Sequence, residues 1–219
     1  MRTRPARVVP VDQQDPDLEV IQRAAQVIEG GGLVVLPTDT VYGLVCDPRQ
    51  SEAVNRVYRV KERRRDQPLA LLLHDMAEAS AYVDEIPEAA VLAMQQFWPG
   101  GLTIVLRDRG EATAAVRANR DTIGLRLPAH LVPRLVAGSA GCPLASTSAN
   151  RSGQPAPTTA AEALAQLEGL VELVLDGGRT PLGQESTVVS FTSDPPRLLR
   201  PGAIPLARLR EVLGDVREK

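Results

Sequence analysis

Short apolar runs alternate along the chain with segments whose apolar residues recur at helical spacing. The clearest helix is predicted over residues 17–29, where Leu18, Ile21, Ala25 and Ile28 share one face and three glycines follow. Further helices are predicted from residue 51 towards 61, with Ser51 as the cap, and over 76–83, 87–97, 131–137, 159–167 and 205–213. Strands are predicted over 33–36, 69–73, 103–106, 123–127, 144–147, 171–175, 187–191 and 197–199.

This alternation implies an α/β fold with a large, twisted, mixed sheet and helices packed on it. The 219 residues contain 43% hydrophobic side chains, enough for a substantial core. No internal repeat, low-complexity tract or convincing linker interrupts the chain. We therefore expect residues 1–219 to form a single domain.

Composition and charge remove several classes of protein. No run of about eighteen apolar residues is present, and Met1 to Pro5 leads into no apolar signal core, so we expect a soluble, cytoplasmic protein. A net charge of −2 argues against a uniformly basic nucleic-acid binder but leaves room for one basic face. The cysteines and histidines have neither disulfide-framework nor metal-site spacing: Cys46, Cys142, His74 and His130.

Polar residues gather where the predicted strands end. The apolar run after Pro143 ends in a row of hydroxyls and an amide, from Ser146 to Asn150. Residues 36–44 place two threonines, a carboxylate and a phenol directly after another strand. Each stretch is typical either of a ligand-lining loop or of an ordinary Asx or Ser/Thr turn, and taken alone the turn is the better interpretation.

Cations suggest what such a site would bind. Residues 61–65 carry four cations at the end of a helix, where the dipole favours one or two. Anion or phosphate binding is therefore about as good an interpretation as a solvated face. Arg126 interrupts an otherwise apolar strand and must face solvent, a carboxylate partner or a binding site. The most specific of these roles is to bind the carboxylate of a ligand. Ser186 and Arg200 repeat the pattern at two more strands, which together predicts a polar, cation-lined cleft.

Familiar catalytic motifs are missing from the sequence. It contains no phosphate-binding P-loop, no dinucleotide-binding glycine turn and no nucleophile elbow. With two histidines in the chain, mechanisms that use a histidine base have few candidates. A reaction whose nucleophile is already anionic would need none.

A set of short motifs lies in order between about residues 33 and 202. The motifs are residues 37–44, the Lys61-x-Arg63 pair with Pro68-Leu69, residues 98–103, 126–130, 148–155, 176–178 and 186–188, and Arg200-Pro201-Gly202. Together they resemble the YrdC/TsaC family of threonylcarbamoyl-AMP synthases. Any one of these motifs is a weak indication of the family, but so many of them in the family's order are highly specific. The resemblance implies a YrdC-like fold with a concave, positively charged cleft.

The resemblance also implies a function. ATP, L-threonine and bicarbonate would give threonylcarbamoyl-AMP and pyrophosphate, with Mg²⁺ carried by the ATP phosphates and no metal ligand assigned in the protein. The product would pass to a TsaD-type transferase that modifies the adenosine beside the anticodon of certain tRNAs. Carried over by position, the family places Thr38, Arg126, Ser146 and Ser186 around threonine, and Lys61, Arg63, Arg65, Thr122, Ser148, Asn150 and Arg200 around ATP, with Lys61 and Arg63 as the catalytic cations.

Some features depart from the family, and two other functions stay open. Arg64 stands where a proline often follows the Lys-x-Arg pair, and His74 comes too late for the histidine that some relatives carry near the substrate. The chain stops soon after Gly202, so we expect the short form without an extra C-terminal domain. The alternatives are a double-stranded RNA or tRNA binding module without catalysis, and an enzyme that makes carbamoyl-adenylate. Only 3% aromatic residues weigh against base stacking by the first.

Overall fold

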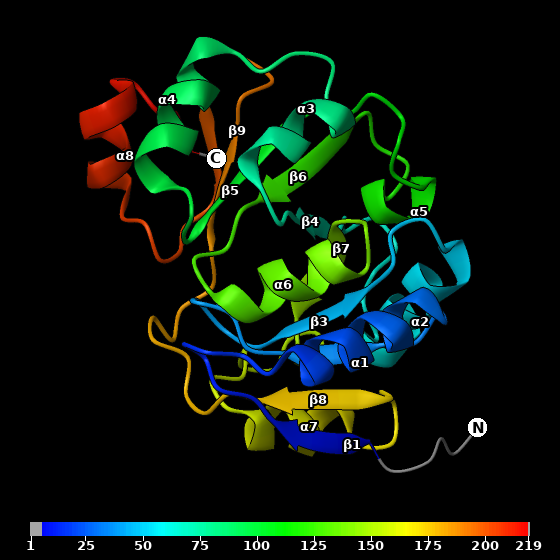
Figure 1. The fold of residues 1–219 in the computed structure, drawn as a ribbon. Coiled ribbons are helices and arrows are strands. Elements are labelled where there is room, and N and C mark those ends of the chain that lie inside the picture. The colour runs from blue at the N-terminus through cyan, green and yellow to red at the C-terminus, as the bar shows by residue number, and fades with distance from the viewer. Residues whose placement is uncertain (1–5, 219) are drawn as a thin grey trace.

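The computed structural model describes residues 6–218, in which strands and helices interleave (Figure 1). The strands are β1 (Arg7–Pro10), β2 (Val34–Leu36), β3 (Gly43–Cys46), β4 (Ala70–Leu72), β5 (Leu102–Arg107), β6 (Thr122–Arg126), β7 (Leu144–Ser148), β8 (Leu173–Asp176), β9 (Thr187–Ser190) and β10 (Arg197–Arg200). The helices are α1 (Leu18–Glu29), α2 (Ser51–Lys61), α3 (Ala79–Tyr82), α4 (Glu88–Phe97), α5 (Ala114–Arg117), α6 (Leu131–Ser139), α7 (Ala160–Leu167) and α8 (Leu206–Leu213), with a 3₁₀ turn at Met76–Glu78.

Within residues 6–218, all ten strands join one mixed sheet in the order β1-β8-β2-β3-β7-β4-β6-β5-β9-β10. Four neighbouring pairs are parallel, namely β1 with β8, β2 with β8, β4 with β6, and β5 with β9; the other pairs are antiparallel. The predicted α/β architecture with a large mixed sheet is confirmed.

Helices cover the two faces of the sheet unequally. One face carries a large core whose buried side chains come from α2, α4, α7 and α8 as well as the strands. The opposite face is covered by α1 and α6, which lie side by side across β3 and β7 in Figure 1. The buried residues of this second core come from β2, β3, β4, β7 and β8 and from none of the described residues of β6, β5, β9 or β10. On that face, α1 and α6 therefore leave β6, β5, β9 and β10 uncovered.

Local sequence explains the first of these helices. Asp17 caps α1 by accepting a hydrogen bond from the backbone N–H of Glu19 (2.8 Å), and Ile21 and Ile28 are fully packed on its inner face. The helix ends at Glu29 with Gly30 as its C-terminal cap, and Gly31 follows with a φ of 77°, a conformation that glycine adopts without steric cost. The predicted helix and its glycine stop are confirmed.

Several sequence predictions need correction. Strands β1 and β3 and the short helix α5 were not predicted, and β3 lies partly within the stretch interpreted as a loop. β3 is short and begins at a glycine, so propensity alone does not reveal it; pairing with both β2 and β7 fixes it. Ser51 is the first residue of α2 and not its cap, since Gln50 holds that position without a side-chain capping bond. The helix predicted over 76–83 divides into the 3₁₀ turn and α3.

None of the helices described in residues 6–218 combines the length and apolarity that a membrane span requires.

Candidate active site

The uncovered part of the sheet forms the floor of a cavity of about 510 Å³. Strand register brings one residue from each of six neighbouring strands into a row across this face, because directly paired residues point to the same side. The row is Ser146, Ala70, Gly124, Val105, Ser190 and Arg197. All six line the cavity, and all but the last are small or medium-sized. Small side chains here leave the concave face hollow.

Eight of the residues assigned from sequence line this one cavity. They come from three strands, β6, β7 and β10, and from three loops that are far apart in sequence: Thr38, Arg63, Thr122, Arg126, Ser146, Ser148, Ser186 and Arg200. The convergence required by the sequence interpretation is therefore present for these residues.

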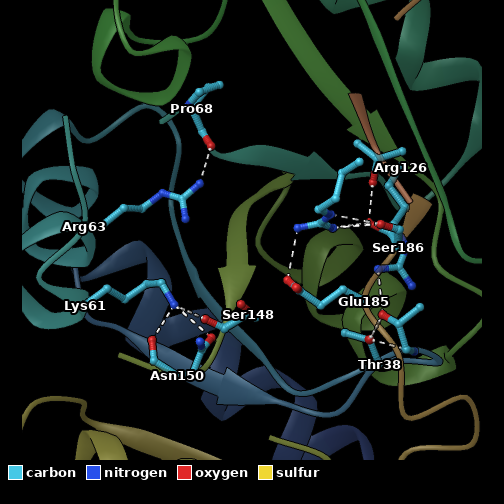
Figure 2. Close-up of polar contacts among 12 residues, drawn as sticks. Thr38, Lys61, Arg63, Pro68, Arg126, Ser148, Asn150, Glu185 and Ser186 are labelled. Atoms are coloured by element: carbon cyan, nitrogen blue, oxygen red, sulfur yellow. Dashed lines mark hydrogen bonds and ion pairs between the residues drawn. The ribbon is translucent and has the colours of Figure 1, made fainter. Parts of the chain in front are cut away.

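Two assigned residues, Lys61 and Asn150, lie behind Ser148 rather than in the cavity lining (Figure 2). The Lys61 ammonium, whose residue is 1% exposed, donates to the backbone carbonyls of Ser148 and Asn150 and to the Asn150 Oδ1 atom at 3.2 Å. The Lys61 carbonyl accepts from the N–H of Ser152 (2.8 Å). Lys61 thus ties the end of α2 to the loop that follows β7.

Arg65 lies outside the cavity lining. Its guanidinium donates to Asn55 Oδ1 and stacks on the ring of Tyr58, 5.1 Å from the centroid. Its contacts are with α2, so the run of cations at residues 61–65 points in different directions. The sequence shows that these charges are close together but not which way each one faces.

Arg126 is buried and held on three sides. Its Nε donates to the carbonyl of Gly100 (3.0 Å), Nη1 to Thr40 Oγ1 (2.9 Å) and Nη2 to Asp39 Oδ1 (2.7 Å). Thr40 Oγ1 lies 2.9 Å from Thr38 Oγ1. Because each terminal guanidinium nitrogen carries two N–H groups, each keeps one for a ligand. Arg126 is thus both a structural ion-pair partner and part of the cavity lining, two roles that the sequence treated as alternatives.

A second polar cluster surrounds Ser186. Its Oγ lies 2.8 Å from Thr103 Oγ1 and accepts from Arg200 Nη2 at 3.0 Å. Arg200 also donates to the Ser186 carbonyl from Nε (3.2 Å) and Nη2 (2.8 Å), and Nη1 pairs with Glu185 Oε1 (3.0 Å). These contacts fix the Arg200 side chain at the cavity wall.

The cavity lining is rich in positive charge. Five arginines contribute to it, against one carboxylate among the described residues, Glu185; the arginines are Arg63, Arg120, Arg126, Arg197 and Arg200. Within residues 6–218, Arg63, Arg120 and Arg197 have no carboxylate within salt-bridge distance. Among the described residues, the acceptors of the Arg63 guanidinium are the carbonyls of Gln67 (3.1 Å) and Pro68 (3.0 Å). Uncompensated cations around a hollow attract an anionic ligand.

Burial lowers the pKa of three of the assigned cations. It lowers the pKa of Lys61 to about 7, and the neighbouring charge of Arg63 adds to this effect while Glu185 opposes it. Burial likewise lowers the pKa of Arg63 and of Arg126, the latter against the opposing influence of Asp39. The cations of this site are therefore poorly solvated and have few carboxylate partners. A bound anion would stabilise their charged forms.

Sequence reasoning missed several residues of this site. Thr40 and Thr103 belong to stretches that it had singled out, and Glu185 directly precedes a third, so the sequence marked their neighbourhood but not the direction of their side chains. Asp39 was visible in the same way; its Oδ1 also accepts from the Ala129 N–H (3.2 Å), and its Oδ2 is buried without a partner among the described residues. No motif marked the two remaining arginines, Arg120 and Arg197.

Neither histidine lines the cavity. His130 caps α6 by accepting from the Val132 N–H (3.2 Å), and His74 pairs with Glu78 (2.8 Å). In the described part of the chain, no cluster of three or more histidine, cysteine or acidic residues is able to hold a metal ion. What this site offers is a hydroxyl- and arginine-lined hollow suited to anions.

Comparison with known proteins matches this geometry to a family. The family model described as "Telomere recombination", which groups Sua5, YciO and YrdC proteins, matches residues 26–202. The chain belongs to the Sua5/YciO/YrdC family. It is 39% identical to the threonylcarbamoyl-AMP synthase of Pyrococcus abyssi over 90% of this chain and 58% of that protein, and 35% identical to the enzyme of Bacillus subtilis over 99% and 63%.

Solved structures of this family are similar over most of the chain. The structure of P. abyssi Sua5 complexed with L-threonine aligns with a TM-score of 0.95 and 36% identity, covering 98% of this chain and 63% of that one. Escherichia coli YciO aligns with a TM-score of 0.82 and 26% identity, covering 90% and 96%. The chain thus spans under two thirds of the length of the Sua5 proteins and nearly all of the length of YciO.

Proposed function

We propose that this protein is a threonylcarbamoyl-AMP synthase, a nucleotidyltransferase that joins L-threonine, bicarbonate and ATP and releases pyrophosphate. The observation that carries the proposal is the likeness to a Sua5 structure that holds L-threonine, over 98% of this chain and with 36% identity. The cation-lined cavity supports it, since both an amino acid carboxylate and a triphosphate need positive partners.

Threonine would bind at the end of the cavity where Arg126 lies. The free N–H groups on the Arg126 guanidinium are suited to a carboxylate, and Thr38, Ser146 and Ser186 supply hydroxyls nearby. Asp39, Thr40 and the Gly100 carbonyl keep the guanidinium plane in place. A guanidinium fixed in advance loses little conformational entropy when threonine arrives.

ATP would bind along the rest of the cavity. Arg63, Arg200, Thr122 and Ser148 line it, and Lys61 contributes positive charge from behind Ser148 while Asn150 holds the Lys61 ammonium. We leave Arg65 out of this set because its contacts lie on α2. The main task of these groups is to neutralise negative charge that grows on the phosphates.

The proposed reaction needs no protein base. The threonine amine adds to the carbon of CO₂ with loss of a proton to solvent, or to that of bicarbonate with loss of water, and forms a carbamate. A carbamate oxygen then attacks the α-phosphorus of ATP while the bond to pyrophosphate breaks. The attacking oxygen is already anionic, which agrees with a cavity whose lining lacks histidine. Catalysis would then rest on holding two anions in line and on stabilising the departing charge.

A magnesium ion bound through ATP fits the donor set. The cavity lining described here provides one carboxylate, and Mg²⁺ is commonly held by one or two carboxylates together with substrate phosphates and water. When bound, the ion would neutralise charge on the phosphates. The protein's arginines would share that work from the other sides.

We further propose that the product passes to a TsaD-type transferase, that tRNA contacts the arginines which line the cavity, and that the protein acts in the cytoplasm.

The deciding experiment is pyrophosphate release from ATP, with the adenylate identified by mass spectrometry. Release that needs both threonine and bicarbonate is expected. Release that needs carbamoyl phosphate instead would indicate a carbamoyl-adenylate enzyme, and RNA binding without release would indicate a binding module.

A further inference from the structure

The one carboxylate in the described cavity lining, Glu185, is placed among cations that would hold a triphosphate. Its charge opposes the lowering of the pKa of Lys61 and Arg63 that burial causes, and its Oε1 lies 3.0 Å from Arg200 Nη1. In Figure 2 its carboxylate points from the Ser186 side of the site towards Ser148. A negative side chain in this position repels phosphate unless a cation lies between them.

The ion pair with Arg200 does not account for Glu185. Both side chains are substantially exposed, 43% for Arg200 and 38% for Glu185, and exposed pairs of this kind add little stability. Arg200 is also held independently of Glu185, through the carbonyl and hydroxyl of Ser186. The Glu185 carboxylate can therefore break its ion pair with Arg200 while Ser186 still holds the Arg200 side chain in place.

The backbone at Glu185 is fixed while its carboxylate has a free oxygen. The Glu185 carbonyl accepts from the Ala203 N–H (2.8 Å), and a Cβ at Gly202 would overlap that carbonyl, so only glycine allows the two segments to approach so closely. Among the described residues, Oε2 of Glu185 has no hydrogen-bond partner. A rigid backbone that presents an unpartnered carboxylate oxygen to a cavity is a suitable arrangement for a hard cation.

We propose that Glu185 is the protein's own ligand for the divalent cation that accompanies ATP. This inference rests on the proposed function, because it assumes that ATP occupies the cavity. Glu185 would share the cation with the phosphates. The Nη1 atom of Arg200, which no longer pairs with Glu185, would then be free to donate to a phosphate oxygen. Glu185 would then repel the phosphates of metal-free ATP but bind the cation of metal-loaded ATP, so the site would favour the metal-loaded nucleotide.

The test compares ATP binding with Mg²⁺ and with excess EDTA, by calorimetry, for the wild type and Glu185→Gln. The glutamine is nearly isosteric but is a poor cation ligand. We expect Mg²⁺ to tighten ATP binding to the wild type, and this tightening to fall about tenfold or more in the variant. Metal-free binding should stay equal or become tighter. Glu52→Gln is the matched control, since Glu52 is an exposed carboxylate paired with Arg59 (2.5 Å) outside the cavity lining.

A spectroscopic readout separates coordination from activity. With Mn²⁺ and ATP, the wild type should change the electron paramagnetic resonance spectrum of Mn²⁺ beyond that of Mn²⁺-ATP bound to Glu185→Gln. An equal effect of metal in both proteins would overturn the inference. So would a variant that binds ATP more tightly by the same factor with and without metal, since Glu185 would then only repel phosphate. A wild type that binds no ATP under either condition would instead remove the proposed function itself.

Discussion

Asp39 Oδ1 lies 2.7 Å from Arg126 Nη2, and the two side chains are only 8% and 7% exposed. Breaking a buried ion pair of this kind by removing one partner typically costs about 3–5 kcal/mol, because an uncompensated charge stays behind. The Asp39–Arg126 pair therefore contributes both to the stability of the fold and to the proposed threonine site. A substitution that keeps the charge but changes the shape of the side chain can separate these two roles.

Arg126→Lys should weaken threonine binding more than it slows the reaction at saturation. Lysine keeps the charge beside Asp39 but cannot donate to Gly100, Thr40 and Asp39 while also presenting N–H groups to a carboxylate. We expect the KM for threonine to rise about tenfold or more, the loss of one charge-assisted hydrogen bond. Threonine titrations of pyrophosphate release would show it. An unchanged KM in a folded variant would contradict this role of Arg126.

Lys61→Ala and Arg65→Ala should behave differently although each removes one cation. Lys61 lies directly behind Ser148, whereas Arg65 stacks on Tyr58 outside the cavity lining. We expect loss of Lys61 to reduce adenylate formation about 10²-fold or more in a protein that still folds. Loss of Arg65 should change it by less than about fivefold. Rates, together with melting curves, would check both, and equal losses in the two variants would refute the assignment.

ATP binding should take up a proton near and above neutral pH. Burial lowers the pKa of Lys61 to about 7, so the free protein loses this proton as the pH rises through 7. A bound triphosphate favours the ammonium and raises its pKa again, so binding restores the proton and ATP affinity should fall as pH increases above 7. Calorimetry at about pH 8 in two buffers with different ionisation enthalpies measures this uptake. Lys61→Met should show less uptake; the same uptake would assign the proton to another group.

Gly124→Val should close the cavity floor without unfolding the protein. A Cβ at Gly124 would lie 3.5 Å from Ala70 Cβ and from Thr103 Cγ2, an ordinary packing distance, and the extra methyl groups would enter the cavity. We expect binding of ATP or threonine to weaken at least about tenfold, with little change in melting temperature. Gly124→Ala is the matched control and should bind far better than the valine variant. Full binding by a stable Gly124→Val protein would show that ligands bind elsewhere.

The local sequence anticipated most elements of this fold. The glycines after α1, the apolar runs of β5, β6, β7 and β9 and the helical spacing of α4 are properties of neighbouring residues, and each element appears where it was predicted. The elements not predicted, β1, β3 and α5, have at most four residues. Segments so short show little periodicity, and pairing with distant strands decides their conformation.

The sequence by itself determined which chemistry was available: hydroxyls and guanidinium groups at strand ends, few histidines and no metal-binding spacing. Only the tertiary structure decided which groups face one another. Register places Ser146, Gly124 and Arg197 in one row, and burial turns Lys61 towards the Ser148 carbonyl while Arg65 points away. The reason is physical: residue type is a local property, whereas direction and counter-charge depend on segments that pack together from distant parts of the chain.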